Sequence, residues 1–317
     1  MGKKERLEYL DLVKGFSIIL IVLGHIYRRG GLVSKCIYSF HVPIFFIVTG
    51  MLLKYKNENN IKKVIINRFK GIMVPYFIFD FFNIIVYLCL NGFTYQNIRW
   101  NIIDTIVLFG RGATWFLPCL FIAEVSFIII RNVFKNDKVH IMCCLVCFFI
   151  PIFITAPNAI IFVLFRSMIA IGFICFGYYI FEKQYYKNYK NYIFIILIIL
   201  FIVLPKNSDA ELYALKFGNV FLYIVNAIVG SLMVITIFKK LKTNKVLKNI
   251  GTNSLIIMGT HQNILNIIFY ILNSRFEGYI EGTILLFVVF IIEFPIIYII
   301  NNYLPFIIGK KRIKSNC

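Results

Sequence analysis

Apolar runs of roughly 17–25 residues recur along this chain, and they limit its possible folds more than any other feature. Each run is long enough to cross the hydrocarbon core of a bilayer as one α-helix. The chain is 60% hydrophobic, with a mean hydropathy of +0.82, whereas soluble domains are about 45–50% apolar. No small-residue cleavage site marks the first run as a removable signal peptide. The pattern predicts an all-α integral membrane protein.

Breaks rich in charged residues, Gly, Pro and Asn divide the chain into ten candidate transmembrane helices. These predicted spans are 10–27, 32–53, 71–90, 113–131, 139–156, 160–181, 192–205, 217–238, 252–272 and 282–303. A further piece, "NIIDTIVLFG", is too short to span and is expected to lie at the interface or to re-enter beside the fourth helix. We expect one helical bundle and one domain over residues 1–317, without an appended soluble domain.

The basic residues of the chain predict its orientation in the membrane. A net charge of +20 would favour nucleic acid in a soluble domain, but the 34 Lys and Arg residues lie almost wholly in short loops. The terminal segments and even-numbered loops hold about three times as many of them as the odd-numbered loops. The positive-inside rule therefore predicts that both termini are cytoplasmic, and no nucleic-acid partner is expected.

The first predicted helix contains three ionisable residues that lipid should reject, Asp11, Lys14 and His25. At 100° per residue, Lys14 and His25 lie about 20° apart around the helix, and Asp11 and His25 about 40° apart. His25 is about 16 Å along the axis from Lys14. The three residues thus share one stripe that runs from the cytoplasmic boundary towards the outer half of the membrane. Alternatively, Asp11 and Lys14 form an i,i+3 surface pair and His25 anchors the outer interface.

Further polar residues are predicted at membrane depth, where they are expected to face a cavity or a partner. His41 lies at a depth similar to that of His25, so the two histidines could face one outer cavity. His261 is expected near mid-membrane and is followed by several amide side chains, among them Asn263. The buried charged residues are completed by Asp80, Glu124, Arg166 and Glu293.

The sequence leaves the partners of these charged residues open. Arg166 and Glu124 could form a structural pair. A carboxylate can orient a histidine that acts as a general base, and Glu124 and Asp80 are the candidates to do so for His25. The eight cysteines lie mostly inside apolar segments, so we interpret them as small core hydrophobes and expect no metal.

Five segments of the chain occur in the order and spacing of a known family. They are "RLEYLDLVKGFSIILIVLGH", "SFHVPIFFIVTGMLLK", "RFKGIMVPYF", "TWFLPCLFIAE" and "IGTNSLIIMGTHQNIL". The chain resembles the acyltransferase-3 family of bacterial membrane O-acyltransferases, and is most similar to its fucose 4-O-acetylase-like group. The most specific feature is the interval from Lys14 to His25. Lys14 stands where the family often has arginine, so a bidentate phosphate contact is not expected there.

The resemblance implies ten transmembrane helices in a bacterial cytoplasmic membrane. It also implies transfer of an acyl group, usually acetyl, from cytoplasmic acetyl-CoA to a hydroxyl of a cell-envelope glycan or lipid-linked sugar. The phosphates of coenzyme A are expected to meet Lys14, Arg68 and other basic residues of the predicted 54–70 loop, and Asp11 is expected to belong to the same binding site. His25 would deprotonate the acceptor hydroxyl or accept the acetyl group covalently. The expected acceptor contacts are His41, Trp115, Arg166, Glu124, His261 and Asn263.

Two other classes of protein would use the same residues differently. In a transporter or flippase for a glycan or lipid-linked sugar, the buried charges would line a substrate or proton pathway. In a non-catalytic assembly or sensor protein, changing His25 or Lys14 would have little effect. Acetyl-CoA hydrolysis that depends on the protein would distinguish an enzyme from both.

Overall fold

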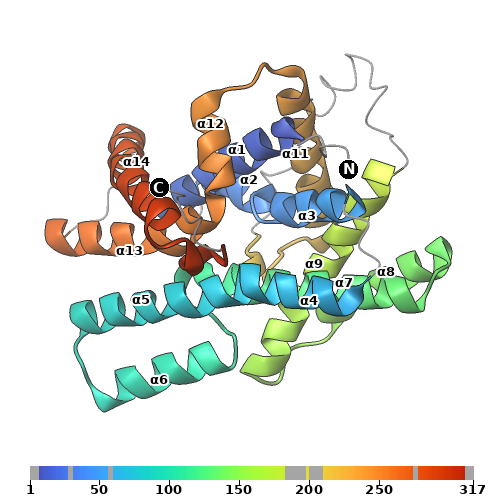
Figure 1. The fold of residues 1–317 in the computed structure, drawn as a ribbon, viewed down its shortest axis with the longest axis horizontal. Coiled ribbons are helices and arrows are strands. Elements are labelled where there is room, and N and C mark those ends of the chain that lie inside the picture. The colour runs from blue at the N-terminus through green and yellow to red at the C-terminus, as the bar shows by residue number, and fades with distance from the viewer. Residues whose placement is uncertain are drawn as a thin grey trace, which may run out of the picture. The chain divides into compact units, whose positions relative to one another are not determined.

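A computed structural model describes residues 7–27, 31–55, 60–182, 198–199, 210–273 and 278–310 (Figure 1). The regular structure in these ranges is helical, apart from one isolated bridge between Glu211 and Lys216. The α-helices are α1 (Glu8–Ile26), α2 (Leu32–Phe40), α3 (Pro43–Tyr55), α4 (Ile61–Arg68), α5 (Val74–Asn91), α6 (Tyr95–Ile106), α7 (Phe116–Val133), α8 (Asp137–Phe153), α9 (Ala159–Glu182), α11 (Val220–Lys240), α12 (Lys245–Thr252), α13 (Ser254–Leu272) and α14 (Tyr279–Asn302). The all-α prediction is confirmed.

Eight helical segments of the described ranges are long and apolar enough to cross a membrane. They are Glu8–Ile26, Leu32–Leu53, Ile61–Asn91, Gly112–Val133, Ala159–Ile180, Val220–Lys240, Ser254–Leu272 and Tyr279–Asn302. Each corresponds to one of the predicted spans. The predicted span 139–156 corresponds to α8, which is shorter at 17 residues, and 192–205 lies outside the described residues except for 198–199. The total of ten spans and the cytoplasmic termini stay predictions.

The segment predicted as a 54–70 loop is mostly helical, which corrects the sequence interpretation. The side chain of Asn60 caps α4 by accepting a hydrogen bond from the Lys63 N–H (3.1 Å). A π-helical turn, Phe69–Met73, then joins α4 to α5 without a break. Pro75 has no N–H to continue the α-helical ladder, and the ladder widens to π-type bonding just before it. One helical segment of 31 residues therefore replaces the predicted loop and span.

The second predicted span, 32–53, contains an interruption. α2 ends at Phe40 and α3 begins at Pro43, because proline cannot donate the backbone hydrogen bond that a continuous helix needs. His41 is the C-cap of α2, and its N–H donates to the Ile37 carbonyl (3.0 Å). The sequence therefore places His41 at a turn within the span.

Internal contacts divide the chain into two compact units. Unit 1 comprises Met1–Lys54 and Phe176–Ser254, and unit 2 comprises Tyr55–Cys175 and Leu255–Cys317. A single domain over residues 1–317 stays a prediction.

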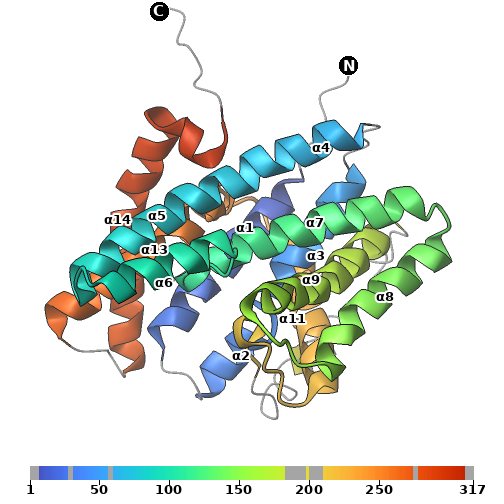
Figure 2. The same cartoon turned by 90° about the horizontal axis from the view of Figure 1, so that it is seen from below.

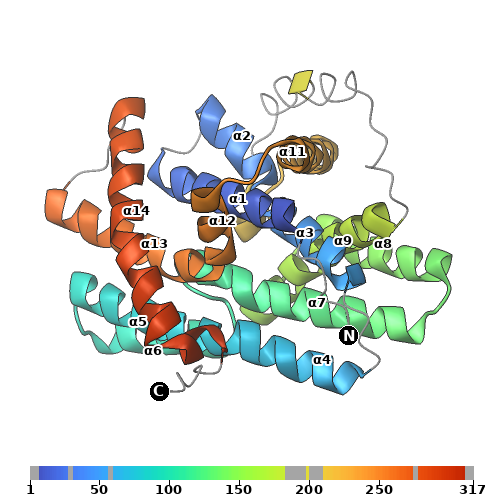
Figure 3. The ribbon, with the colours of Figure 1, turned by 45° about the horizontal axis from the view of Figure 1, so that its top comes forward.

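In unit 1, α1 packs against α12, α11 and α2 (Figure 3). Two glycines allow the approach of α12. A Cβ on Gly251 would lie 1.8 Å from the Asp11 carbonyl oxygen, and one on Gly15 would lie 2.3 Å from that of Leu247. Since real Cβ atoms do not come this close, the backbones of α1 and α12 can touch only at glycine.

In unit 2, α6 packs along α5, and α7 packs against both α4 and α8 (Figure 2). The Tyr76 hydroxyl of α5 donates to the Thr105 carbonyl of α6 (3.2 Å). The first part of the short apolar piece thus packs on α5, and its end contacts the start of the fourth predicted helix, because Gly110 lies against the Trp115 backbone. Its placement at the membrane interface stays a prediction.

Candidate functional site

Asp11 and Lys14 form an ion pair near the start of α1 in unit 1. Lys14 Nζ lies 2.8 Å from Asp11 Oδ1, and the side chains are 24% and 6% exposed, respectively. The carbonyl oxygen of Asp11 is covered by Gly251 of α12. The i,i+3 pair that the sequence allowed is therefore present, with the carboxylate buried and the lysine side chain partly exposed.

His25 lies in the last turn of α1 and is half-buried. Tyr38 of α2 packs beside it, since the tyrosine hydroxyl donates to the carbonyl oxygen of Gly24 (3.1 Å). The Tyr38 ring also meets the His41 ring edge-on, with centroids 4.9 Å apart. Through Tyr38, His25 and His41 thus lie near the same end of α1, in agreement with the similar membrane depths that the sequence predicts for them. A cavity shared by the two histidines stays a prediction.

Two buried histidines have a defined tautomer. His41 Nδ1 lies 2.7 Å from the Ile37 carbonyl oxygen, and His261 Nδ1 lies 2.6 Å from that of Ile257. A carbonyl oxygen only accepts hydrogen bonds, so the ring proton is on Nδ1 in each case. In the neutral ring, Nε2 carries the lone pair and could accept a proton or a hydrogen bond.

Arg68 and Glu124 form an ion pair within unit 2. Arg68 Nε lies 2.9 Å from Glu124 Oε1, and the side chains are 23% and 2% exposed, respectively. Because Arg68 binds the carboxylate through Nε, its terminal nitrogens are the atoms with which it could meet a phosphate. The pairing of Glu124 with Arg166, and the role of Glu124 beside His25, stay predictions.

Arg166 is buried on α9 among aromatic rings of unit 2. Its guanidinium carbon lies 4.5 Å from the ring centroid of Phe109, 4.6 Å from that of Phe162 and 5.2 Å from that of Trp115. Arg166 Nη1 also donates to the Phe109 carbonyl (3.1 Å). These contacts stabilise a buried cation. Trp115 is itself buried, so little of its ring surface is open to a sugar, and its predicted contact with the acceptor is not supported.

Asp80 of α5 is the centre of a polar network in unit 2 that the sequence interpretation did not identify. Its carboxylate accepts hydrogen bonds from the hydroxyls of Thr105 and Thr114 and from the Arg111 N–H. These bonds fix α6 and the turn after it onto α5. The only available signal was an aspartate within the apolar span 71–90. A role for Asp80 in orienting His25 stays a prediction.

The neighbouring Asn83 connects this network to α13. Asn83 Nδ2 donates to the Arg111 carbonyl (3.2 Å), and Asn263 Nδ2 donates to Asn83 Oδ1 (2.6 Å). The Arg111 N–H also donates to the Asp80 carboxylate, so Asn263, Asn83 and Asp80 belong to one hydrogen-bonded network. Asp104 lies at its edge, where burial raises the pKa of its carboxyl although Arg111, 3.4 Å away, opposes the shift.

An open groove of about 560 Å³ lies between the ends of α5 and α13 in unit 2. It is lined by Tyr87, Leu90, Asn91, Asn266, Phe269, Tyr270 and Asn273. The Arg111 guanidinium lies over the Tyr87 ring, 4.2 Å from its centroid. Three amides and three aromatic rings can bind the hydroxyls and the apolar faces of a sugar. The sequence interpretation identified the amides after His261, but not the part of α5 that faces them.

Asn226 on α11 is a further residue that the sequence interpretation missed. It is fully buried in unit 1, and neither atom of its amide has a hydrogen-bond partner among the described residues. Such a group costs about 1–3 kcal/mol when it stays unsatisfied. A lone asparagine in the predicted span 217–238 was the available signal.

The fold and these buried polar groups define a helical membrane protein in which several polar side chains lie within an apolar core. Residues 7–307 match the family described as Acyltransferase domain. The chain therefore belongs to the acyltransferase-3 family, which supports a membrane acyltransferase and does not favour a transporter. No curated protein and no solved structure matched the chain.

Proposed function

We propose that the protein transfers an acetyl group from cytoplasmic acetyl-CoA to a sugar hydroxyl of a cell-envelope glycan or lipid-linked sugar. The family supports acyl transfer in a membrane. The observation that carries the finer proposal is α1, which holds a charged pair at one end and a histidine at the other. We further propose that the protein lies in a bacterial cytoplasmic membrane with both termini in the cytoplasm.

The donor binds where α1 begins. Coenzyme A carries several negative charges, and the accessible ammonium group of Lys14 offers a positive charge at the predicted cytoplasmic boundary. Asp11 holds Lys14 in place through their 2.8 Å contact. Arg68 is the second basic residue that the sequence analysis assigns to the donor, and its terminal nitrogens are not needed for its Nε contact to Glu124.

The reaction takes place where α1 ends. His25 removes the proton from the sugar hydroxyl, and the oxygen attacks the thioester carbonyl carbon. The bond from carbon to sulfur then breaks, and the coenzyme A thiolate leaves and takes up a proton. In the alternative route, the His25 ring accepts the acetyl group first and passes it to the sugar. His41 supports either route with an Nε2 lone pair near the same end of α1.

The groove of unit 2 is the best candidate for the acceptor. Its aromatic rings and amides can bind a sugar, and a neutral sugar does not require a charged residue in the groove. Asn263 and the Asp80 network hold the adjoining part of α13 and α5 together. On the predicted orientation, α5 and α13 both end at the outer face of the membrane, where an exported glycan is found.

The test is mass spectrometry of envelope glycans and lipid-linked sugars from cells with and without the protein. We expect a protein-dependent gain of one acetyl group per modified sugar, which disappears in His25→Gln. Lys35→Gln on α2 is the matched control, because it also changes a basic residue of unit 1 but is not assigned to the site. Unchanged masses in the presence of a well-inserted protein would contradict the proposal, as would full acetylation by His25→Gln.

A further inference from the structure

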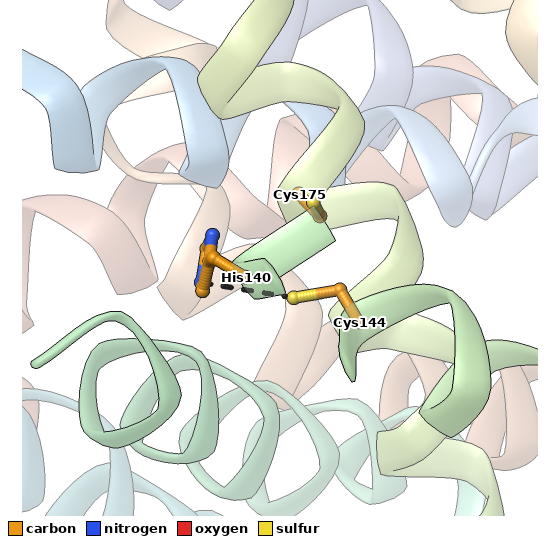
Figure 4. A group of neighbouring side chains, drawn as sticks. All are labelled: His140, Cys144 and Cys175. Atoms are coloured by element: carbon orange, nitrogen blue, oxygen red, sulfur yellow. Dashed lines mark hydrogen bonds between the residues drawn. The ribbon is translucent and has the colours of Figure 1, made fainter. Parts of the chain in front are cut away.

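Three potential metal ligands that the proposed reaction does not use meet inside unit 2. They are His140 and Cys144 of α8 and Cys175 of α9 (Figure 4). Their ligand atoms all lie within 4.8 Å of one another, and all three residues are buried. The described part of the chain contains no second group of this kind.

One distance within this group matches that between two ligands on a tetrahedral ion. His140 Nε2 lies 3.7 Å from Cys144 Sγ. Zinc bonds of about 2.0–2.1 Å to nitrogen and 2.3 Å to sulfur, at a tetrahedral angle, would place these atoms about 3.6 Å apart. His140 and Cys144 are four residues apart, so they lie on the same face of α8 and can bind one ion together.

The histidine ring is also held in the way that metal ligands are. The His140 ring hydrogen-bonds to the backbone of Phe127 on α7, and it packs edge-on against the Phe127 ring with centroids 4.8 Å apart. In metalloproteins, the ring nitrogen that does not bind the ion is commonly bonded to a carbonyl or carboxylate. This contact orients Nε2 towards the two cysteines.

We propose that His140, Cys144 and Cys175 bind one zinc ion that fastens α8 to α9. Two thiols and a neutral imidazole lose two protons on binding Zn²⁺, and these protons pass to the solvent. The bound group then has no net charge, which suits an apolar interior better than a charged complex would. A fourth tetrahedral position stays open for water, as in other sites with two cysteines and one histidine.

The test uses the full-length protein in detergent. We expect about one zinc per chain in the purified protein, measured by elemental mass spectrometry. Cobalt that replaces it should give thiolate-to-metal charge-transfer absorption. Cys144→Ser and Cys175→Ser should each weaken binding on the order of 100-fold or more, since loss of a direct ligand exceeds the effect of an outer-shell change. Cys143→Ser, which alters the adjacent residue of α8 outside the group, should keep the ion.

Several outcomes would overturn the proposal. One is wild-type protein that takes up neither zinc nor cobalt. Another is binding that persists in both serine variants. A third is a Cys144–Cys175 disulfide, detected by peptide mass spectrometry after thiol blocking in cells. Because the cobalt spectrum is measured on the wild type, the result does not depend on whether a serine variant folds.

Discussion

At the residue scale, removing one partner of the ion pair between Arg68 and Glu124 should destabilise unit 2. Glu124 is 2% exposed, so removing Arg68 leaves a buried carboxylate without this compensating charge. We expect Arg68→Met to lower the free energy of unfolding by about 3–5 kcal/mol, measured by thermal unfolding in detergent.

The protein offers a matched control for this change. Arg131 pairs with Asp137 at 2.7 Å, but Asp137 is 52% exposed, and such surface pairs contribute about 0–1 kcal/mol. Arg131→Met should therefore have little effect. The double variant Arg68→Met/Glu124→Met should regain most of the lost stability, because the carboxylate is removed together with its partner. Equal losses in Arg68→Met and Arg131→Met would contradict this account.

Asn226 should behave in the opposite way. Its fully buried amide has no hydrogen-bond partner within the described residues, so replacement by an apolar side chain of similar size removes a cost. We expect Asn226→Leu to stabilise the protein by about 1 kcal/mol and to lower acetyl transfer, since a destabilising polar group is commonly kept for function. A loss of stability would show that the amide is satisfied in the membrane, and unchanged transfer would exclude a role in the reaction.

Residues that interact within one helix were the predictable ones. Asp11 and Lys14 are three residues apart, so the sequence alone indicated their pairing. Arg68 and Glu124 come from α4 and α7, and nothing in the sequence brings these helices together. The same limit applies to His140, whose i,i+4 spacing to Cys144 was available, whereas Cys175 is supplied by another helix.

At the element scale, the close contact of α1 with α12 should be the least tolerant of added volume. A Cβ on Gly251 would lie 1.8 Å from a backbone oxygen of α1, which cannot move aside as a side chain can. We expect Gly251→Ala to cost at least about 1–3 kcal/mol and to lower transfer, because Asp11 and Lys14 lie at this contact. Thermal unfolding and acetyl transfer would be measured together.

Gly71→Ala is the comparison for this variant. A Cβ on Gly71 has no neighbouring atom within 4 Å, and alanine favours helical structure over glycine by about 1 kcal/mol. The substitution should therefore be neutral or slightly stabilising. If Gly251→Ala unfolds at the same temperature as Gly71→Ala, the tight packing of α12 on α1 is wrong.

The helices were predictable where a long apolar run determines them, and less so where proline or capping residues determine a helix boundary. Eight predicted spans correspond to helical segments of sufficient length. The predicted loop 54–70 was wrong because Lys and Arg in a short stretch suggested a break, although long basic side chains can extend from a helix. The interruption at His41 could have been read from Pro43.

At the scale of the whole molecule, the sidedness of the reaction follows from the charge distribution. The basic residues predict that the start of α1 faces the cytoplasm, and Lys14 is accessible at that end. Acetyl-CoA is too polar to cross a bilayer, so it should reach the protein from one side only. Inside-out membrane vesicles should therefore transfer acetyl groups from added acetyl-CoA, and right-side-out vesicles should not.

Lys14→Gln tests whether the donor enters past Lys14. Lys240→Gln is its control, because it removes a positive charge at the exposed end of α11. We expect Lys14→Gln to raise the KM for acetyl-CoA in inside-out vesicles about 10-fold, since an ionic contact to a phosphate contributes about 1–2 kcal/mol. Lys240→Gln should leave the KM unchanged. Transfer only in right-side-out vesicles would reverse the predicted orientation. Equal transfer by intact vesicles of both orientations would show that acetyl-CoA can enter from either membrane face. Lys14 lies at one face only, so entry past Lys14 would then not be required.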